Sequence, residues 1–400
     1  MIACLLCTAL LQALTSSAQP VTKIAGGDNH SLFLKSDGSL WAMGENQHGQ
    51  LGDGTYNNTN LPEQIVASNV TVIAAGSENT LFLKSDGSLW AMGENQYGQL
   101  GNGTTSDTNL PEQIVDSNVT AIAAGWYHTL FLKSDGSLWA MGDNQFGELG
   151  DGSYNSTNRP EMIVASNVTT IAAGATHSLF LKSDGSLWTM GANGYGELGD
   201  GSTDNGNYQT NRPELIVSNI VTAIAAGDDH SLFLKSNGSL WGMGNGELGQ
   251  LGNGATNGGN ILSPQQIVAS GITAMAGGGN HTLFLKNNGS LWAMGFDPYG
   301  QLGDGHYTPT YPYGTNQPEQ IVAGTLGYNQ VSVQLLNGGN VGLSYVGIAG
   351  TNYGLDLSFS LSPANWVPQL TNSAGAGGVL VFTNTPNKTT NNFWRIHSVP

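Results

Sequence analysis

The sequence has little charge, and very little of it is positive. Charged residues make up 10% of the 400-residue chain, against about 25% in a typical soluble domain. Lys and Arg together number 11 against 28 Asp and Glu, which gives a formal net charge of −17. A nucleic-acid-binding surface needs Lys and Arg to replace the counterions around phosphates. The composition therefore argues against a nucleic-acid partner.

Cysteine and long apolar runs are also scarce. Both cysteines, Cys4 and Cys7, lie in an apolar stretch that is followed by Ser16-Ser17-Ala18. This stretch has the length and the small-residue ending of a secretory signal peptide, although no Lys or Arg precedes it. We expect residues 1–18 to be a signal peptide; a short buried helix is the alternative. The mature chain would then have no disulfide. No apolar run approaches the roughly 20 residues that a membrane-spanning helix needs, so we expect no membrane span.

Glycine, by contrast, is abundant, with 58 residues, and the sequence repeats itself. The phrase HSLFLKSDGSLWAMG recurs six times with small changes. Its tryptophan falls at Trp41, Trp90, Trp139, Trp188, Trp241 and Trp292, at spacings of 49 to 53 residues. A period of this length is typical of propellers and repeat arrays.

Each repeat contains the pattern of four short strands. In the first repeat, residues 22–25, 31–35, 39–43 and 63–66 have strand character, and no helical periodicity is present. Asp37-Gly38 joins the second and third strands and predicts a two-residue type I′ hairpin turn. Four strands in a repeat of about 50 residues indicate a propeller blade. The sequence predicts an all-β fold: a propeller of six repeats over residues 19–325, with six blades or with seven if an irregular blade closes it.

The repeat also resembles that of the regulator of chromosome condensation family. The resemblance rests on Gly-x-x-His, the Asp-Gly hairpin, the Trp and Gly-Gln-Leu-Gly recurring together and in order, from Val21 to about Ala323. It implies a β-propeller, usually of seven blades. Members of this family include nuclear exchange factors for a small GTPase and secreted bacterial proteins that bind other proteins. Together with the signal peptide, the resemblance favours a secreted or cell-surface bacterial protein.

Residues that recur in every repeat are best explained by the blade itself. A histidine stands in one register in five repeats, and Asn79 replaces it in the second, so we expect hydrogen-bonded structural histidines. The residues at the His48 position are expected to pack, and the lysine before each hairpin to be solvated. The Gly-Asp-Gly steps lack the ligand ladder of an EF-hand. Calcium on these Asp- and Asn-rich loops stays open as an alternative to the prediction of no metal and no cofactor.

Function is therefore sought where the repeats differ. In the third repeat, Trp126 and Tyr127 stand where most other repeats carry small or polar residues, which indicates an exposed aromatic anchor. The fifth repeat has Asp228 and Asp229 at the same place. The loop of the sixth repeat is the longest. These departures give the candidate binding residues Trp126, Tyr127, Asp228, Asp229, His306, Tyr307, Tyr311 and Tyr313. Packing against a neighbouring blade and a merely decorative closing loop are the alternatives.

After Ala323 the repeat stops. Tyr353, Leu355, Leu357, Phe359 and Leu361 alternate at period two, the pattern of a half-buried strand. Val379–Phe382 and Phe393–Ile396 have strand character as well. We predict a small β-sandwich-like module over residues 326–400.

No catalytic motif is present. The sequence contains no Gly-x-Ser-x-Gly elbow and no His-Glu-x-x-His zinc motif. We therefore predict a secreted or cell-surface, non-catalytic binding or scaffold propeller that presents rim loops to a protein or glycan partner. Two alternatives remain: nucleotide exchange on a small GTPase, and a carbohydrate-active enzyme whose paired carboxylates converge from different blades.

Overall fold

The computed structural model of the protein describes residues 19–203, 210–254, 259–308 and 313–322, and the backbone of six strands between residues 331 and 399. The expected signal peptide lies outside these residues. The chain divides into two compact units, Met1–Gly194 with Thr203–Ile224 and Tyr195–Ser202 with Ala225–Pro400. Each unit is described by itself.

The described chain is all β. Blade 1 contains β1 (Val21–Gly26), β2 (His30–Lys35), β3 (Leu40–Gly44) and β4 (Thr59–Val66). Blade 2 contains β5 (Val70–Ala75), β6 (Asn79–Lys84), β7 (Leu89–Gly93) and β8 (Thr108–Val115). Blade 3 contains β9 (Val119–Ala124), β10 (His128–Lys133), β11 (Leu138–Gly142) and β12 (Thr157–Val164).

The remaining blades have the same composition. Blade 4 contains β13 (Val168–Ala173), β14 (His177–Lys182), β15 (Leu187–Gly191) and β16 (Thr210–Val217). Blade 5 contains β17 (Val221–Ala226), β18 (His230–Lys235), β19 (Leu240–Gly244) and β20 (Ile261–Val268). Blade 6 contains β21 (Ile272–Gly277), β22 (His281–Lys286), β23 (Leu291–Phe296) and β24 (Gly314–Val322).

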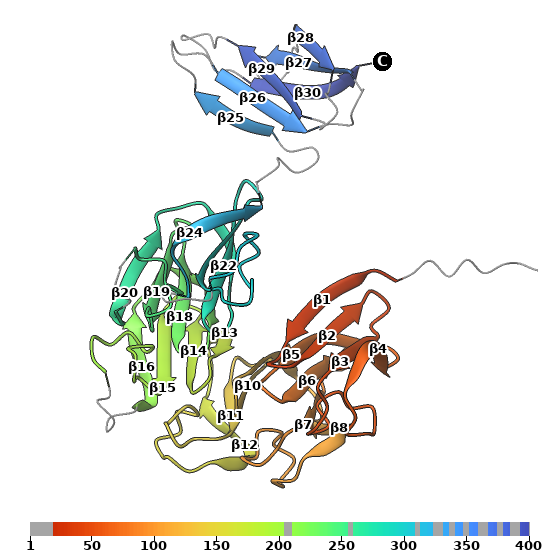
Figure 1. The fold of residues 1–400 in the computed structure, drawn as a ribbon, viewed down its shortest axis with the longest axis vertical. Coiled ribbons are helices and arrows are strands. Elements are labelled where there is room, and N and C mark those ends of the chain that lie inside the picture. Colours follow the sequence, from red (N-terminus) through yellow and green to blue (C-terminus); the bar gives the residue numbers. More distant parts are fainter. Residues whose placement is uncertain are drawn as a thin grey trace, which may run out of the picture. The chain divides into compact units, whose positions relative to one another are not determined.

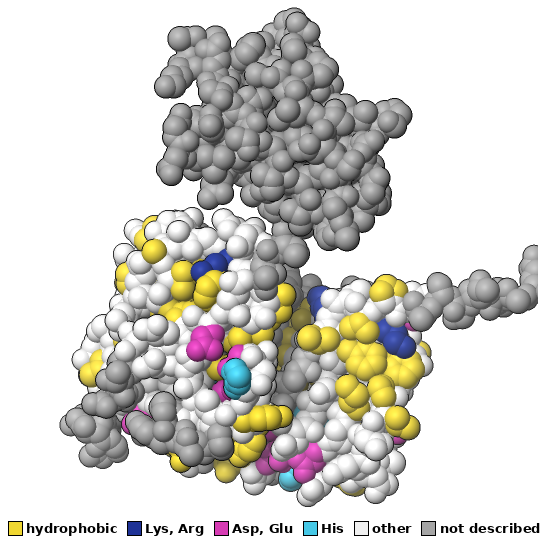
Figure 2. Space-filling model, turned by 45° about the horizontal axis from the view of Figure 1, so that its top comes forward, with side chains coloured by type: hydrophobic (Ala, Val, Ile, Leu, Met, Phe, Trp, Pro, Cys, Tyr) yellow, Lys and Arg dark blue, Asp and Glu magenta, His cyan; other side chains and the backbone are white. Residues whose placement is uncertain are grey.

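Every blade is a four-stranded antiparallel meander whose strands pair in chain order (Figure 1). The prediction of a six-bladed β-propeller is confirmed, and the described residues contain no seventh four-stranded sheet. Among these residues, no helix is long and apolar enough to cross a membrane. On the face drawn in Figure 2, dark blue Lys and Arg side chains are sparse, as the composition leads one to expect.

Six further strands follow the propeller. β25 (Val331–Leu335), β26 (Val341–Val346) and β29 (Val379–Asn384) form one antiparallel sheet, in the order β25-β26-β29. β27 (Asn352–Ser358), β28 (Val367–Ser373) and β30 (Phe393–Val399) form a second, in the order β28-β27-β30. The strands expected at 379–382 and 393–396 are present, and so is the strand expected at 353–361 as far as Ser358; residues 359–361 lie outside the described residues. The sandwich-like packing of the two sheets stays a prediction.

The apolar core lies between consecutive blades. The second strand of blade 1 turns Leu32 and Leu34 toward blade 2, where Phe82 and Met92 complete one buried cluster. The pattern repeats between blades 2 and 3 and between blades 3 and 4. Because side chains alternate along a strand, each blade offers leucines on one face and Phe and Met on the other. Burying each leucine contributes about 1.5–3 kcal/mol.

The hairpin between the second and third strands differs from the predicted type I′ turn. A type I′ turn needs positive φ at both central residues, but only Gly38 has it, at +80°. Gly38 N donates to Lys35 O, and Lys35 N donates to Ser39 O, both at 3.0 Å. This is a three-residue hairpin, a turn followed by a left-handed glycine. The asparagine or aspartate before the glycine accepts hydrogen bonds from the following serine instead.

The repeated lysines are partly exposed, but they also make a contact that the sequence did not predict. Each lysine Nζ lies 3.4–4.1 Å from the centroid of a tryptophan ring on the next strand of the same hairpin, as Lys35 does from Trp41. Each tryptophan also stacks on the phenylalanine opposite it, with centroids 6.0–6.2 Å apart. The lysines therefore cover the tryptophans through cation–π contacts, which a short strand pattern does not reveal.

The repeated histidines are structural, as predicted. His128 Nε2 lies 2.9 Å from Ser178 Oγ of the next blade, and that hydroxyl donates to Glu148 O at 2.8 Å. His30 and His230 make the same contact with a threonine of the next blade. The hydroxyl uses its proton on the carbonyl, so the imidazole Nε2 donates. Burial lowers the pKa of His128 to about 4.

We expect His128→Asn to change the pH dependence of stability. The variant loses the bond to Ser178 and so melts below the wild type at pH 7. As the pH falls from about 6.5 to about 4, the unfolded chain binds a proton at its ordinary histidine pKa before the folded chain does, and the wild type loses stability that the variant retains. The difference in Tm should therefore shrink at low pH. An equal Tm difference at pH 7 and pH 4 would contradict the assignment. Asn79 occupies this position in blade 2, so the variant is compatible with the fold.

A buried glutamate gives the opposite pH dependence. Glu148 Oε2 accepts a hydrogen bond from Phe146 N at 2.8 Å, and in blades 1 and 2 a glutamine oxygen accepts the same bond at 3.0 Å. Burial raises the pKa of Glu148 to about 7. The folded chain therefore loses stability as the pH rises from the ordinary glutamate pKa to about 7.

We expect Glu148→Gln to raise the Tm at pH 8, because the amide keeps the bond to Phe146 N and carries no buried charge. At pH 5 the wild-type carboxyl is protonated in the folded state, so the gain should largely vanish. Thermal melting at the two pH values measures the effect. A gain of the same size at both values would show that burial of the charge is not its cause.

Candidate functional site

Each blade has two ends with different contents. His30 pairs with Gly44 across β2 and β3, and Gly26 pairs with Ser31 across β1 and β2. The turn between the first two strands and the loop between the last two therefore lie at one end, which we call the loop end. The lysine–tryptophan hairpin lies at the other. The predicted binding residues that the structure describes stand at the loop ends of their blades.

The loop ends of blades 1 to 3 gather a group of charged and aromatic side chains, which we call the acidic–aromatic cluster. Its members come from the loops between β3 and β4, β5 and β6, β7 and β8, and β9 and β10. They are His48, Glu78, Glu94, Tyr97, Asp107, Trp126 and Tyr127.

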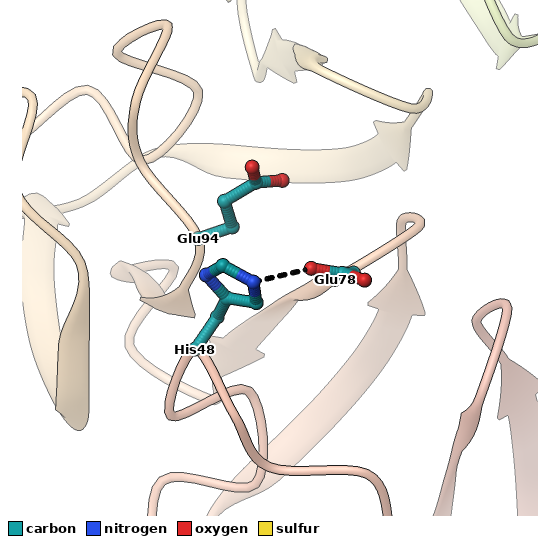
Figure 3. A group of neighbouring side chains, drawn as sticks. All are labelled: His48, Glu78 and Glu94. Atoms are coloured by element: carbon teal, nitrogen blue, oxygen red, sulfur yellow. Dashed lines mark ion pairs between the residues drawn. The ribbon is translucent and has the colours of Figure 1, made fainter. Parts of the chain in front are cut away.

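The imidazole of His48 connects two carboxylates. Its Nε2 lies 2.8 Å from Glu78 Oε2, and its Nδ1 lies 2.8 Å from Asp107 Oδ2. Figure 3 shows the imidazole beside Glu78, with Glu94 close to the same ring. Burial opposes the charged form, but the hydrogen bond to Asp107 and the charge of Glu78 outweigh it and raise the pKa of His48. With both carboxylates ionised, each ring nitrogen has to donate, so this geometry favours the charged imidazole.

Glu94 is the buried member of this group, at 5% exposed. Burial raises its pKa to about 7; the charge of His48 opposes this, and the nearby Glu78 and Asp107 add to it. Gln96 Nε2 donates to Glu94 Oε1 at 2.7 Å. Near neutral pH this carboxyl is therefore poised between its two protonation states, and a cation that arrives from outside would favour the ionised one.

The aromatic members form a continuous set. The rings of Tyr97 and Tyr127 lie 4.9 Å apart and tilted, and Trp126 meets Tyr127 edge-on at 6.4 Å. Trp126 is 37% exposed, so it is an accessible ring held by its neighbour. Tyr127 is half-buried and packs on Tyr97 of blade 2. Packing against a neighbouring blade was the alternative to an exposed anchor for this residue. Burial, with the charge of Glu94, raises the pKa of Tyr127.

A shallow hollow of about 460 Å³ lies beside Tyr97. Its lining is uncharged and consists of hydroxyl and amide groups around one aromatic ring: Gln96, Tyr97, Thr105, Ser156, Thr157 and Asn158. Such a lining can hydrogen-bond neutral polar groups and stack against a flat apolar face.

His48, Glu78 and Glu94 are the residues of the cluster that could hold a metal ion, since their donor atoms all lie within 4.8 Å of one another. Both nitrogens of His48, however, are engaged by carboxylates in this arrangement. The group as it stands is an ion-pair network with an excess of negative charge. Its chemistry is that of an electrostatic and aromatic binding surface.

The other predicted binding residues belong to the second unit. Asp228 and Asp229 are half-buried, and burial raises the pKa of Asp229. Tyr307 is 71% exposed, and Tyr313 is 37% exposed with its ring 6.2 Å from Phe296. His306 is exposed, and Tyr311 lies outside the described residues. As binding residues, all eight remain predictions.

Sequence reasoning missed five members of the cluster: His48, Glu78, Glu94, Tyr97 and Asp107. His48 and Tyr97 share a register whose residues were expected to pack, yet His48 is ionic, and Tyr299 in the same register is 81% exposed. Glu78 and Glu94 were treated as ordinary loop residues. A signal was available: His48, Glu78 and Glu94 as a combination occur at one place among the six repeats.

Comparison with known proteins gives the same picture of the repeat. The sequence matches the family described as "RCC1-like domain" over residues 8–216 and 68–344. It is 37% identical over 82 residues to the RCC2 homolog of Danio rerio, covering 20% of this chain and 16% of that protein. It is 35% identical over 96 residues to mouse RCC2, covering 23% of this chain and 17% of that protein. The chain thus spans about a sixth of the curated relatives it matches.

Solved structures agree over a longer stretch. Human WBSCR16 superimposes with a TM-score of 0.67 at 24% identity, covering 77% of this chain and 83% of that one. Prp20p of Saccharomyces cerevisiae also gives 0.67 at 24% identity, covering 78% and 79%. At this level of identity the likeness concerns the fold. The family match covers more than half of the chain, and the protein belongs to the RCC1-like domain family.

Proposed function

We propose that this protein is a secreted or cell-surface binding protein without catalytic activity, and that the acidic–aromatic cluster recognises a basic segment of a protein partner. The exposed ring of Trp126 meets Tyr127 edge-on, and burial together with the charges of Glu94 and Glu78 raises the pKa of Tyr127. This link between an accessible aromatic ring and the carboxylates is the observation that carries the proposal. Exported status rests on the signal-like residues 1–18.

The chemistry of the cluster selects the partner. Three carboxylates surround one imidazole, so the cluster keeps an excess of negative charge even when that imidazole is protonated. A Lys or Arg side chain would find both carboxylates and the faces of aromatic rings there, the two groups that attract a cation. The net charge of −17 adds a long-range attraction that speeds the encounter with a basic partner.

Fixed loops suit this role. His48 ties the loops of blades 1 and 2 together through Glu78 and Asp107, and Trp126 N donates to Ala175 O of blade 4 at 3.3 Å. Groups that are already held in place lose little conformational entropy when a partner binds. Among relatives, Prp20p of yeast is described with its binding to Gsp1p and histones, which are protein partners of that protein.

The proposal is tested with the double variant Trp126→Ala/Tyr127→Thr, which copies Ala175-Thr176 of blade 4 and so fits the repeat. The mature protein is used as bait in an extract of the secreted proteins of the native organism. The affinity of the captured partner is then measured by calorimetry. We expect the variant to weaken binding by about tenfold or more, as loss of an aromatic anchor does. Unchanged affinity would refute the cluster as the binding surface.

The pH dependence of the same interaction gives a second test. Glu94 ionises around pH 7, so affinity for a basic partner should rise between pH 6 and pH 8 and should fall with added salt. Glu94→Gln should remove most of the pH dependence while keeping the neutral-state contacts. Equal pH dependence in the variant and the wild type would assign it to other groups.

A glycan is the second candidate ligand, because of the neutral hollow beside Tyr97. Binding of neutral oligosaccharides that is lost in Tyr97→Ala and unaffected by salt would favour it over a basic protein segment. Nucleotide exchange is checked in the same way: release of labelled nucleotide from a captured GTPase would replace the scaffold proposal with that activity.

A further inference from the structure

One loop position of blade 6 differs from the other blades in charge. In blades 1, 2 and 3 an asparagine stands two residues after the third-strand glycine that pairs with the start of the second strand, at Asn46, Asn95 and Asn144. In blade 6 the residue at this position is Asp297. The substitution exchanges an amide NH₂, which donates two hydrogen bonds, for an oxygen that only accepts them when ionised.

The surroundings of this position are built for a donor. Asn46 Nδ2 donates to Asp53 Oδ1 at 3.1 Å and to Thr55 O at 3.2 Å. In blade 3, Asn144 Nδ2 likewise donates to a side-chain oxygen of Asp151, at 3.0 Å, and to two backbone carbonyls, at 3.3 Å. The amide nitrogen therefore sits in a ring of oxygen acceptors.

Blade 6 keeps the geometry of this loop. Leu302 N donates to Asp297 Oδ1 at 2.9 Å, as Leu51 N does to Asn46 Oδ1 in blade 1. His306 N donates to Asp304 Oδ1 at 2.8 Å, as Thr55 N does to Asp53 Oδ1. Asp297 thus occupies the asparagine position, with its second oxygen where the amide nitrogen would be.

That second oxygen has no hydrogen-bond partner, although Asp297 is only 1% exposed. A buried acceptor without a donor is unfavourable, and a charged one more so. The hydroxyl of Thr308 is a second buried oxygen there without a partner. Two buried oxygens without partners beside the same hollow indicate that a cation or a hydrogen-bond donor binds there.

Space and further ligands are present. Asp297 and Thr308 border a hollow of about 230 Å³ whose lining also includes Asp304, Glu319 and Asn316. Among the described residues, none of the three carboxylates forms an ion pair with Lys or Arg. The hollow therefore combines oxygen ligands with uncompensated negative charge.

We propose that blade 6 binds a calcium ion in this hollow, with Asp297 as its central ligand and Asp304, Thr308 and Glu319 beside it. Calcium takes six to eight oxygen ligands in flexible geometry, which suits a mixed set of carboxylates, hydroxyl and amide on a loop. Zinc prefers His nitrogen and Cys sulfur ligands, and the lining of the hollow contains neither His nor Cys. The calcium site is separate from the acidic–aromatic cluster and does not depend on the proposed function.

The test uses the full mature chain, freed of metal with a chelator. We expect calorimetry with calcium chloride to give one equivalent of binding, and Tm to rise when calcium is added, because a ligand that binds the folded state stabilises it. Magnesium should bind more weakly, since it demands a rigid octahedral arrangement.

Asp297→Asn restores the residue of blades 1 to 3 and is compatible with the loop. It should weaken calcium binding by at least about tenfold, since it removes the central charged ligand. In calcium-free buffer its Tm should equal or exceed that of the wild type, because the amide supplies donors to the surrounding acceptors. Asp53→Asn, in a blade whose amide already fills the position, is the matched control and should leave calcium affinity unchanged.

Three results would overturn the proposal. Absence of any calcium effect on the wild type would mean that the hollow holds no calcium ion. Equal calcium affinity in Asp297→Asn would place the ion elsewhere. A loss of affinity in Asp53→Asn as large as that in Asp297→Asn would indicate diffuse attraction to the acidic loops of the propeller.

Discussion

The apolar contact between consecutive blades is the interaction on which the rest of this structure depends. A single four-stranded blade cannot bury its own side chains, because its two faces carry leucines and aromatic residues that point in opposite directions. Stacking brings the leucine face of one blade onto the Phe and Met face of the next. The histidine bond adds direction to this contact, since Nε2 of one blade reaches a hydroxyl of the following one. Loop ends then inherit fixed positions, and the acidic–aromatic cluster becomes possible.

Much of the fold was predictable because the same strand pattern recurs in six repeats. The alternation of side chains predicted the four-stranded blade, and the replacement of the histidine by Asn79 predicted that the histidines have a structural role. The hairpin was predicted wrongly, because Asp-Gly fits both a two-residue and a three-residue turn and only the backbone dihedrals distinguish them. The position of the lysines over the tryptophans was missed for a related reason. Their contact runs across the strand pair and depends on side-chain direction, which a linear pattern does not contain.

The candidate site was harder to predict than the fold. Trp126 and Tyr127 were found because they break the repeat with large side chains. His48, Glu78 and Glu94 each look ordinary in their own repeat, and they matter because three loops from two blades bring them together. Asp297 differs from asparagine by a single group, and its meaning depends on acceptors that lie several residues away in the sequence. Sequence differences between repeats point to such places, but only coordinates show which of them meet.

The core clusters have a consequence for how such a chain lengthens and melts. Each of the described clusters draws its residues from two neighbouring blades, so the free energy of the array is close to a sum of blade terms and nearest-neighbour terms. A duplicated blade would find its two interfaces ready-made, and a damaged one would weaken two junctions rather than all of them. The contact between two neighbouring blades therefore does not depend on the number of blades in the chain. Gene duplication can change that number while every interface keeps the same residues.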